Sequence, residues 1–351
     1  MKTASLTLLT AVAALAMVSC SEDEPLSVAD SHHSIQFRPA MGNVSRAAET
    51  NNTNLAAINV AAYLNDQLYF PVLEFDKGAD GVFSSSPDYY WPTDDSRLSF
   101  TAYAPVNPGG DVALDATSHV MTDFSPAASM GDQVDFITAD ATGYRSANEA
   151  TGVELTFSHK LSQIEVLAKT DNENYTFKVS GVRIAQPVAK ADYDFNADTW
   201  TLGTDKAVYE ATYDTPVVLT STAASVMGDG HSAMLIPQQL TAWDNVNDST
   251  NTAKGAYLAV KLEVATAATG VTVYPFPSDA DCQWAAIPID TDWQPGKTYI
   301  YTLDFTHGGG YVDPHDPQPG KPVLGGPIRF TVDVADWVAE NVDQTMSTSQ
   351  K

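Results

Sequence analysis

The chain has 351 residues, with 18 Lys or Arg against 44 Asp or Glu, which gives a formal net charge of −26. Such an acidic surface repels phosphate backbones and anionic lipid, and this argues against nucleic-acid binding. Hydrophobic residues make up 44% of the chain, which excludes wholesale disorder. The length exceeds the usual size of one domain, so we expect two.

The first twenty residues have the pattern of an export signal. Lys2 supplies a positive charge, and Leu6–Val18 is an uncharged apolar run too short for a comfortable membrane span. The run ends at Cys20 and an acidic stretch follows, which resembles a bacterial lipobox, where cleavage precedes a lipid-bearing cysteine. We therefore expect a lipoprotein signal peptide with Cys20 as the lipidation site. The alternative is an ordinary secretory signal; either way the protein leaves the cytoplasm.

The remaining cysteine is a poor candidate for chemistry. Once Cys20 carries lipid, Cys282 has no partner for an internal disulfide or a metal cluster. Its neighbours Trp284 and Ile287 indicate a small buried apolar residue rather than a nucleophile.

Short alternating segments, separated by Gly, Pro, Asn and Asp turns, follow one another from residue 55 onward. This pattern predicts an antiparallel β-sandwich. The Ala-rich stretches 139–150 and 221–226 are too short and too broken to predict helices. Strands are expected at 58–64, 68–70, 72–75, 98–105, 134–137, 153–161, 164–168, 175–179, 182–185, 217–220, 234–236, 257–264, 271–274 and 298–305.

The buried face changes between two of these strands, 153–161 and 164–168. Leu155, Phe157, His159 and Leu161 share one parity, whereas the apolar residues from 164 to 168 take the other. A slip of one residue near 162–163 would do this through a bulge or a corner.

The chain ends with a Gly- and Pro-rich acidic stretch, 307–327, and a strictly alternating segment. We expect 307–327 to be an extended, mobile tether rather than a packed loop. Beyond it, Ile328, Phe330, Val332 and Val334 face one way, as in a half-buried β-strand. Such a strand could pair within its own molecule or with another molecule.

The search for a catalytic or metal site gives no strong candidate. There is no phosphate-binding loop, nucleophile elbow or metal-type spacing of His and Cys, so neither a catalytic residue, a cofactor nor a metal is expected. His159 is interpreted as a hydrogen-bonded core histidine. Asp313, His315 and Asp316 have the chemistry to hold calcium or another hard cation, but a solvated acidic tether is preferred.

The six tryptophans of the chain raise the alternative of a sugar-stacking surface. Aromatic residues that follow strand patterns are more often part of a core, and Trp91, before Pro92, is expected to plug a sandwich edge. The others are Trp200, Trp243, Trp284, Trp293 and Trp337.

Six motifs in order, spread over nearly the whole mature chain, resemble the fimbrillin family, the type V pilins of Bacteroidales. Each motif is weak by itself, and their order carries the resemblance. They are Ile35–Phe37 before an Arg-containing loop, Tyr89–Pro92 with Leu98–Pro105, Leu155–Leu161, Met234–Gln238, Trp293–Tyr299 and Ile328–Trp337.

The resemblance implies an all-β protein with two tandem transthyretin-like β-sandwich domains. It also implies export as an outer-membrane lipoprotein, a protease cut after an Arg in an N-terminal loop, and loss of the first strand. The C-terminal strand of the next subunit then fills the exposed groove and a pilus grows. By position, Arg46 is the cut site, Ile35–Phe37 belongs to the displaced strand, and 328–334 supplies the groove-filling residues. Arg38 is a competing cut site, disfavoured by Pro39.

The expected role is that of a polymerising shaft subunit at the cell surface. Its expected partners are copies of itself, related fimbrial subunits, outer-membrane lipid through Cys20, and a host or bacterial surface ligand. The alternative is a non-polymerising surface lipoprotein, or a tip adhesin that binds glycan or a host protein. The expected segments are 1–20 (signal), 21–46 (propeptide), 47–150 and 151–306 (sandwich domains), 307–327 (tether) and 328–351 (donor strand and polar tail). The polar tail 338–351 is a departure from the family pattern, in which the donor strand is expected to finish near the C-terminus.

Overall fold

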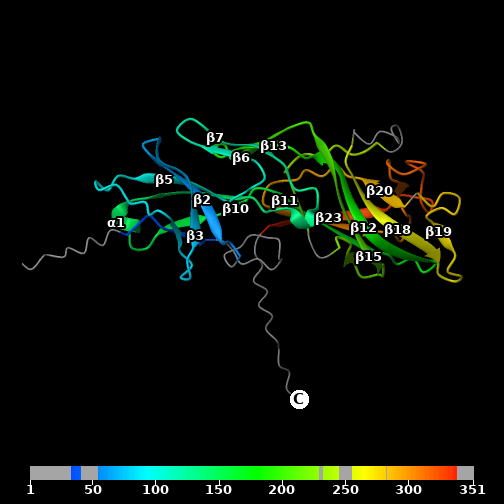
Figure 1. Ribbon diagram of the computed structural model, residues 1–351. Coiled ribbons are helices and arrows are strands. Elements are labelled where there is room, and N and C mark those ends of the chain that lie inside the picture. The colour runs from blue at the N-terminus through cyan, green and yellow to red at the C-terminus, as the bar shows by residue number, and fades with distance from the viewer. Residues whose placement is uncertain (1–32, 41–53, 229–231, 245–254, 282, 338–351) are drawn as a thin grey trace, which may run out of the picture.

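The computed structural model describes residues 33–40, 54–228, 232–244, 255–281 and 283–337, and these form almost only β-structure (Figure 1). The exceptions are one turn of α-helix, α1 (Arg145–Asn148), and one 3₁₀ turn, η1 (Met130–Asp132). No helix within these ranges has the length and apolar character to cross a membrane. The expected all-β fold is confirmed.

An eight-stranded sheet forms one end of the elongated molecule (Figure 1). It curls around an apolar core to which seven of its strands contribute, because the alternating residues of those strands turn one face inward. In sheet order the strands are β10 (Ser158–His159), β8 (Ile137–Gly143), β5 (Leu98–Ala104), β2 (Ala57–Leu64), β3 (Gln67–Lys77), β4 (Phe83–Ser85), β1 (Phe37–Ala40) and β9 (Val153–Thr156).

The other end is a sandwich of two sheets around a second core. The five-stranded sheet contains β16 (Ala224–Ser225), β11 (Ser162–Lys169), β21 (Lys297–Asp304) and β23 (Arg329–Asp336), with β17 (Ala233–Leu235) paired to β11. The six-stranded sheet contains β15 (Lys206–Val218), β12 (Tyr175–Val188), β18 (Tyr257–Thr266), β20 (Trp284–Pro288) and β22 (Tyr311–Val312), with β19 (Thr272–Tyr274) paired to β18.

A four-stranded sheet lies along the molecule and joins distant parts of the chain. Its strands are β14 (Thr199–Leu202), β13 (Ala191–Asp194), β7 (His119–Phe124) and β6 (Asp111–Leu114). A third core separates this sheet from the outer face of the eight-stranded sheet. Because strands from both sides of residue 150 build it, the division into domains at 150/151 stays a prediction.

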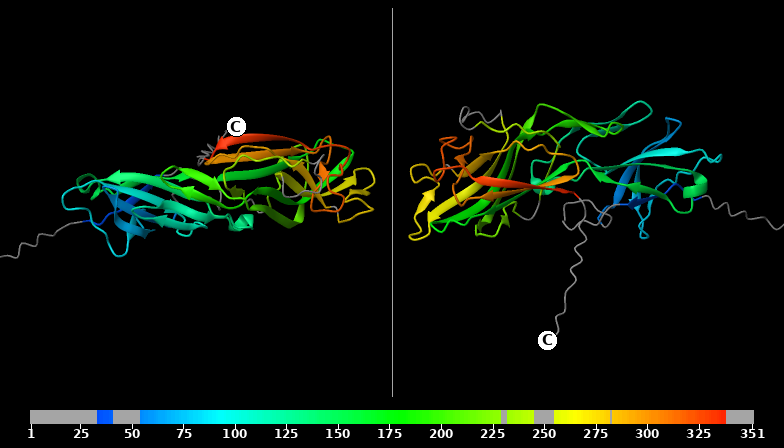
Figure 2. Two further views of the ribbon diagram at one scale, coloured as in Figure 1. Left: turned by 90° about the horizontal axis from the view of Figure 1, so that it is seen from above. Right: turned by 180° about the vertical axis from the view of Figure 1, so that it is seen from behind.

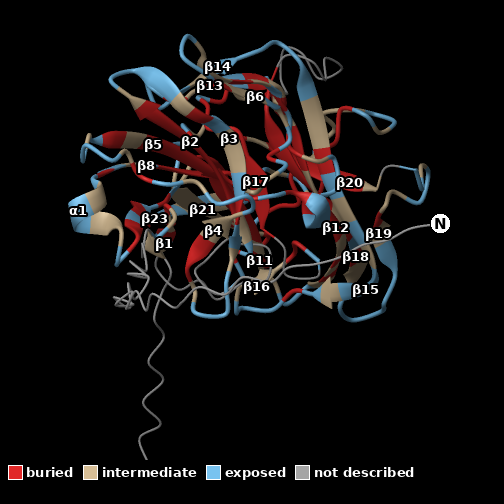
Figure 3. Ribbon diagram, turned by 60° about the vertical axis from the view of Figure 1, so that its left-hand side comes forward, coloured by how far each residue is buried: buried red, intermediate tan, exposed pale blue. Residues whose placement is uncertain are grey.

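Strand pairing is mostly antiparallel. The two parallel strand pairs in the described ranges are β1 with β9 and β11 with β21. The change of face expected near 162–163 is where the chain leaves β10 of the eight-stranded sheet and enters β11 of the five-stranded sheet. Figure 3 shows buried residues concentrated on the strands and exposed residues on the loops.

The expectation of a mobile tether at 307–327 is wrong for the described structure. Gly308, Gly309, Gly310 and Val323 are all buried, and β22 lies within the segment. A Cβ atom on Gly308 would meet the carbonyl oxygen of Gly326 at 2.4 Å. The glycines therefore allow two backbone segments to approach closely, a use of glycine that composition cannot distinguish from flexibility.

Candidate functional site

The first described strand, β1, is built into the eight-stranded sheet. It pairs in parallel with β9 over four residues, from Phe37 opposite Val153 to Ala40 opposite Thr156. On its other side, Phe37 pairs with Phe83 of β4. The strand thus lies between two neighbours and closes the gap between them.

The side chains of this segment fill the core that the sheet encloses. Ile35 and Phe37 are fully buried. The Phe37 ring packs edge-to-face on Phe75 and Phe100, with centroids 4.9 and 5.0 Å apart. Loss of the segment would therefore open an apolar slot and leave backbone groups of β4 and β9 unpaired.

The last described strand, β23, pairs antiparallel with β21 and forms the edge of the five-stranded sheet. Figure 2 shows it, in red, lying along one side of the molecule. Phe330 lies opposite Leu303, and Val332 opposite Tyr301. The alternation expected from the sequence is confirmed here, since Phe330 and Val332 pack against the second core.

The far end of this apolar row is poorly covered by its own molecule. Ile328 is buried, Phe330 and Val332 are half-buried, and Val334 is 56% exposed. The strand thus pairs its backbone within its own molecule but leaves part of its apolar side chains exposed to water.

Trp337, directly after β23, anchors the strand to another part of the fold. Its indole is buried and stacks on the ring of His159. The Nδ1 atom of His159 lies 2.9 Å from the buried carboxylate of Asp135, which confirms a hydrogen-bonded core histidine. The Trp337 amide donates to the carbonyl of Gly296, and Lys297 pairs with Asp336. Sequence reasoning noted both rings, but gave no signal that they meet.

The segment before β23 is fixed by a buried ion pair. The Arg183 guanidinium contacts the fully buried Asp313 carboxylate at 2.9 Å, and it also donates to Glu210 and covers the face of Trp284. Burial alone would raise the pKa of Asp313, but a hydrogen bond with His315 and the charge of Arg183 outweigh it and lower that pKa. The preferred interpretation, a solvated acidic stretch, is therefore wrong for Asp313.

The alternative interpretation of this cluster as a cation site finds no support either. Asp316 accepts hydrogen bonds from the backbone amides of Gln283 and Trp284, so its carboxylate fastens β20 to the loop. Across the described ranges, no group of three His, Cys, Asp or Glu side chains could hold a metal ion.

The remaining predicted residues divide into two sets. All tryptophans except the half-buried Trp200 are buried, as expected for core aromatics, and Trp91 packs edge-to-face on Phe100 in the first core. Cys20, Arg46, Cys282 and the tail 338–351 lie outside the described residues.

A comparison with solved structures finds several similar chains. They include a candidate cell adhesion protein from Bacteroides ovatus (15% identity, 88% of this chain and 99% of that chain, TM-score 0.49). A fimbrillin from Porphyromonas gingivalis is 13% identical over 88% of this chain and 98% of that chain, with a TM-score of 0.48. The fimbrial anchor protein Mfa2 of the same organism is 12% identical over 87% and 98%, with a TM-score of 0.35.

A comparison with curated proteins finds no match. The fimbrillin-like family model, in contrast, matches residues 45–337, which include nearly all of the described structure. This range contains the eight-stranded sheet from β2 onward, both sheets of the sandwich, and the C-terminal strand with its Trp337 anchor. The chain therefore belongs to the fimbrillin-like family, a family of fimbrial subunits.

Proposed function

We propose that this protein is a shaft subunit of a surface fimbria that assembles by donor-strand exchange. It is exported as an outer-membrane lipoprotein through Cys20 and cut after Arg46. The segment that ends in β1 then leaves, and the C-terminal strand of the next subunit takes its place. Its partners are copies of itself and related fimbrial subunits, and its role is structural rather than catalytic.

The environment of β1 supports the receiving half of this proposal. The strand is short, Phe37 within it and Ile35 just before it are core residues, and Arg46 follows Ala40 by six residues. A cut there would separate β1 from the rest of the fold, to which only non-covalent contacts would hold it. An alternating strand from another subunit could restore both the lost backbone pairing and the lost apolar contacts.

The half-exposed apolar face of β23 supports the donating half, and it is the observation that carries the proposal. Val334 is 56% exposed in the monomer, and Phe330 and Val332 are only half-buried. Full burial of one such side chain is worth about 1.5–3 kcal/mol relative to full exposure, and Phe330, Val332 and Val334 would each gain part of it, since Ile328 is already buried. The strand therefore gains apolar burial when it moves from an edge into an enclosed slot.

A cleavage experiment tests the proposal. The purified protein without its signal peptide is treated with an Arg-specific protease, and oligomers that survive mild heating in detergent are sought by electrophoresis. We expect a ladder for the parent protein and none for Arg46→Ala. A cut protein that stays monomeric would instead support the alternative, a non-polymerising surface lipoprotein or tip adhesin.

The donor strand is tested with a pair of matched variants. Val334→Asp places a charge on a side chain that is already exposed in the monomer, so folding should be unaffected, whereas insertion into an apolar slot should fail. Val218→Asp is the control, since Val218 is 53% exposed on the edge strand β15. Equal ladders for the two variants would contradict the assignment of β23 as the donor strand.

A further inference from the structure

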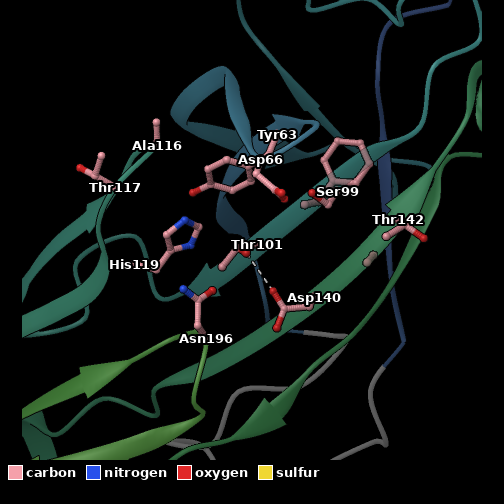
Figure 4. A pocket seen from close by; sticks show the side chains of 12 residues that line it. Tyr63, Asp66, Ser99, Thr101, Ala116, Thr117, His119, Asp140, Thr142 and Asn196 are labelled. Carbon is pink, nitrogen blue, oxygen red and sulfur yellow. Dashed lines mark hydrogen bonds between the residues drawn. The ribbon is translucent and has the colours of Figure 1, made fainter.

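A polar cleft of about 700 Å³ opens on the outer face of the eight-stranded sheet, beside the four-stranded sheet. Phe100 alone of its lining residues also borders the slot used in the fimbrial assembly proposed above, since its ring packs on Phe37. Figure 4 shows its side chains arranged around a common space. The cleft receives residues from the sheet face of β2, β5 and β8, from the β6–β7 turn, and from turns at Asp66 and Asn196.

The floor of the cleft is a row of small polar side chains. Ser99 and Thr101 of β5 lie opposite Thr142 and Asp140 of β8. The Thr101 hydroxyl donates to one oxygen of the Asp140 carboxylate at 2.8 Å, as the dashed line in Figure 4 marks. Because Asp140 is exposed, its other oxygen can accept from a ligand.

One side of the cleft contains two buried polar atoms without a partner. The rings of Tyr63 and His119 stack with centroids 4.8 Å apart, and Figure 4 shows them next to each other. Tyr63 is only 5% exposed, yet its hydroxyl, like Nδ1 of His119, makes no hydrogen bond within the described part of the chain. Buried polar atoms in folded proteins are nearly always paired, so a partner from outside the chain is the expected complement.

The charge of the cleft restricts the chemistry of that partner. Asp66 and Asp140 line it, and no Lys or Arg does so among its described lining residues. Burial, and then the nearby carboxylates of Asp115 and Asp140, raise the pKa of Tyr63 to about 12, so the phenol is neutral at pH 7. Arg97 lies at the Thr142 end, where it donates to that hydroxyl at 2.7 Å. The Tyr63 end is thus the negative one, which disfavours anions.

We propose that this cleft binds a primary ammonium group, carried by a lysine side chain or by an amino sugar. An ammonium has three hydrogen-bond donors and no acceptor. Asp140 offers it a carboxylate oxygen, Asp66 a second carboxylate, and the neutral Tyr63 hydroxyl an uncharged acceptor. Charge-assisted hydrogen bonds of this type are stronger than those between neutral groups.

The test uses the whole, uncut protein, so that failure of fimbrial assembly would not affect it. Binding of Nα-acetyl-lysine amide and of glucosamine is followed by ligand-observed NMR at constant ionic strength. The neutral counterparts are the Nα,Nε-diacetylated lysine amide and N-acetylglucosamine. We expect saturable binding of at least one amine and none of the neutral forms, and the amine that binds more tightly identifies the source of the group.

Two variants locate the binding. Asp140→Asn removes a charged acceptor and should weaken the amine about tenfold. Tyr63→Phe, checked for folding by thermal unfolding, should also weaken it. Asp214→Asn removes an exposed carboxylate on β15, outside the cleft, and should leave affinity unchanged. Failure of both amines to bind would overturn the proposal, and so would equal losses in Asp140→Asn and Asp214→Asn, which would indicate attraction to the overall charge.

Discussion

Trp337 stacks face to face on His159, with ring centroids 4.3 Å apart and ring planes 8° apart. The stack joins two sheets, because His159 ends β10 of the eight-stranded sheet and Trp337 directly follows β23 of the five-stranded sheet. The candidate donor strand is thus fastened at its end to a distant part of its own molecule. Donation of the strand requires this stack to break.

Replacement of Trp337 by Ala should loosen β23. Loss of a buried tryptophan costs about 3–5 kcal/mol where the surroundings do not collapse. Since the contact joins only the end of an edge strand, the cost should appear as local opening rather than global unfolding. Amide hydrogen exchange of residues 329–336 should accelerate about a hundredfold, which corresponds to about 3 kcal/mol.

The control for this experiment is Tyr90→Ala, which removes an aromatic side chain that is 50% exposed. It should leave exchange of β23 unchanged. In both variants the central strand β18 should keep its protection. Unchanged exchange of β23 in the Trp337 variant would mean that pairing with β21 alone holds the strand.

Replacement of Phe37 by Ala should destabilise the uncut precursor but not the assembled fimbria. In the precursor it removes a fully buried ring that packs against Phe75 and Phe100, so the free energy of unfolding should fall by about 3–5 kcal/mol. If β1 is lost on assembly, the same substitution should not alter the heat resistance of the oligomer ladder. Denaturant unfolding and gel electrophoresis measure the two quantities, and a less resistant ladder would show that Phe37 stays in the fibre.

Alternation in the sequence was enough to predict the fold class and much of the strand content. It located β2, β5 and β9, and it placed the change of face near 162–163, at the start of β11, where the chain has passed from one sheet to another. It also identified the inward parity of Phe330 and Val332. These features depend on neighbours within one strand, which is why periodicity detects them.

The features that were missed depend on contacts between distant segments. Asp313 is an ordinary acidic loop residue until Arg183, 130 positions earlier, is brought beside it. The β6–β7 hairpin pairs with β13, which no local pattern indicates, and this pairing brings the four-stranded sheet beside the Tyr63–His119 cleft. In the sequence the glycines at 308–310 indicate flexibility, whereas the contacts of Gly308 and Gly310 with 326–328 show that they allow a close approach of two backbone segments.

Replacement of Gly308 by Ala tests whether this glycine is needed for the close approach of the two segments. The three atoms nearest to the new Cβ are all backbone atoms, the closest at 2.4 Å, so the two segments would have to separate. A loss of about 1–3 kcal/mol in the free energy of unfolding is expected from such overpacking. Gly326→Ala, on the facing segment, is the matched control, because its Cβ would meet only the His307 carbonyl at 3.8 Å. A mobile tether would tolerate both substitutions equally.

Replacement of Asp313 by Asn should destabilise the protein at pH 7 and change how its stability depends on pH. The substitution leaves Arg183 buried without one of its two carboxylates, which should cost about 3 kcal/mol, the low end of the usual range, since Glu210 remains. Asp333→Asn, at an exposed position on β23, should cost far less.

The pH dependence follows from the lowered pKa of Asp313 in the folded protein. The unfolded chain has the ordinary Asp value of about 3.9, so it binds the proton more readily than the folded protein does. The contribution of Asp313 to stability is therefore complete above about pH 4 to 5 and is lost as the pH falls through the folded pKa. Denaturant unfolding at pH 7, 5 and 3 should show the parent protein and Asp313→Asn converging in acid. A constant difference at all three pH values would mean that the lost interaction is one of packing and not of charge.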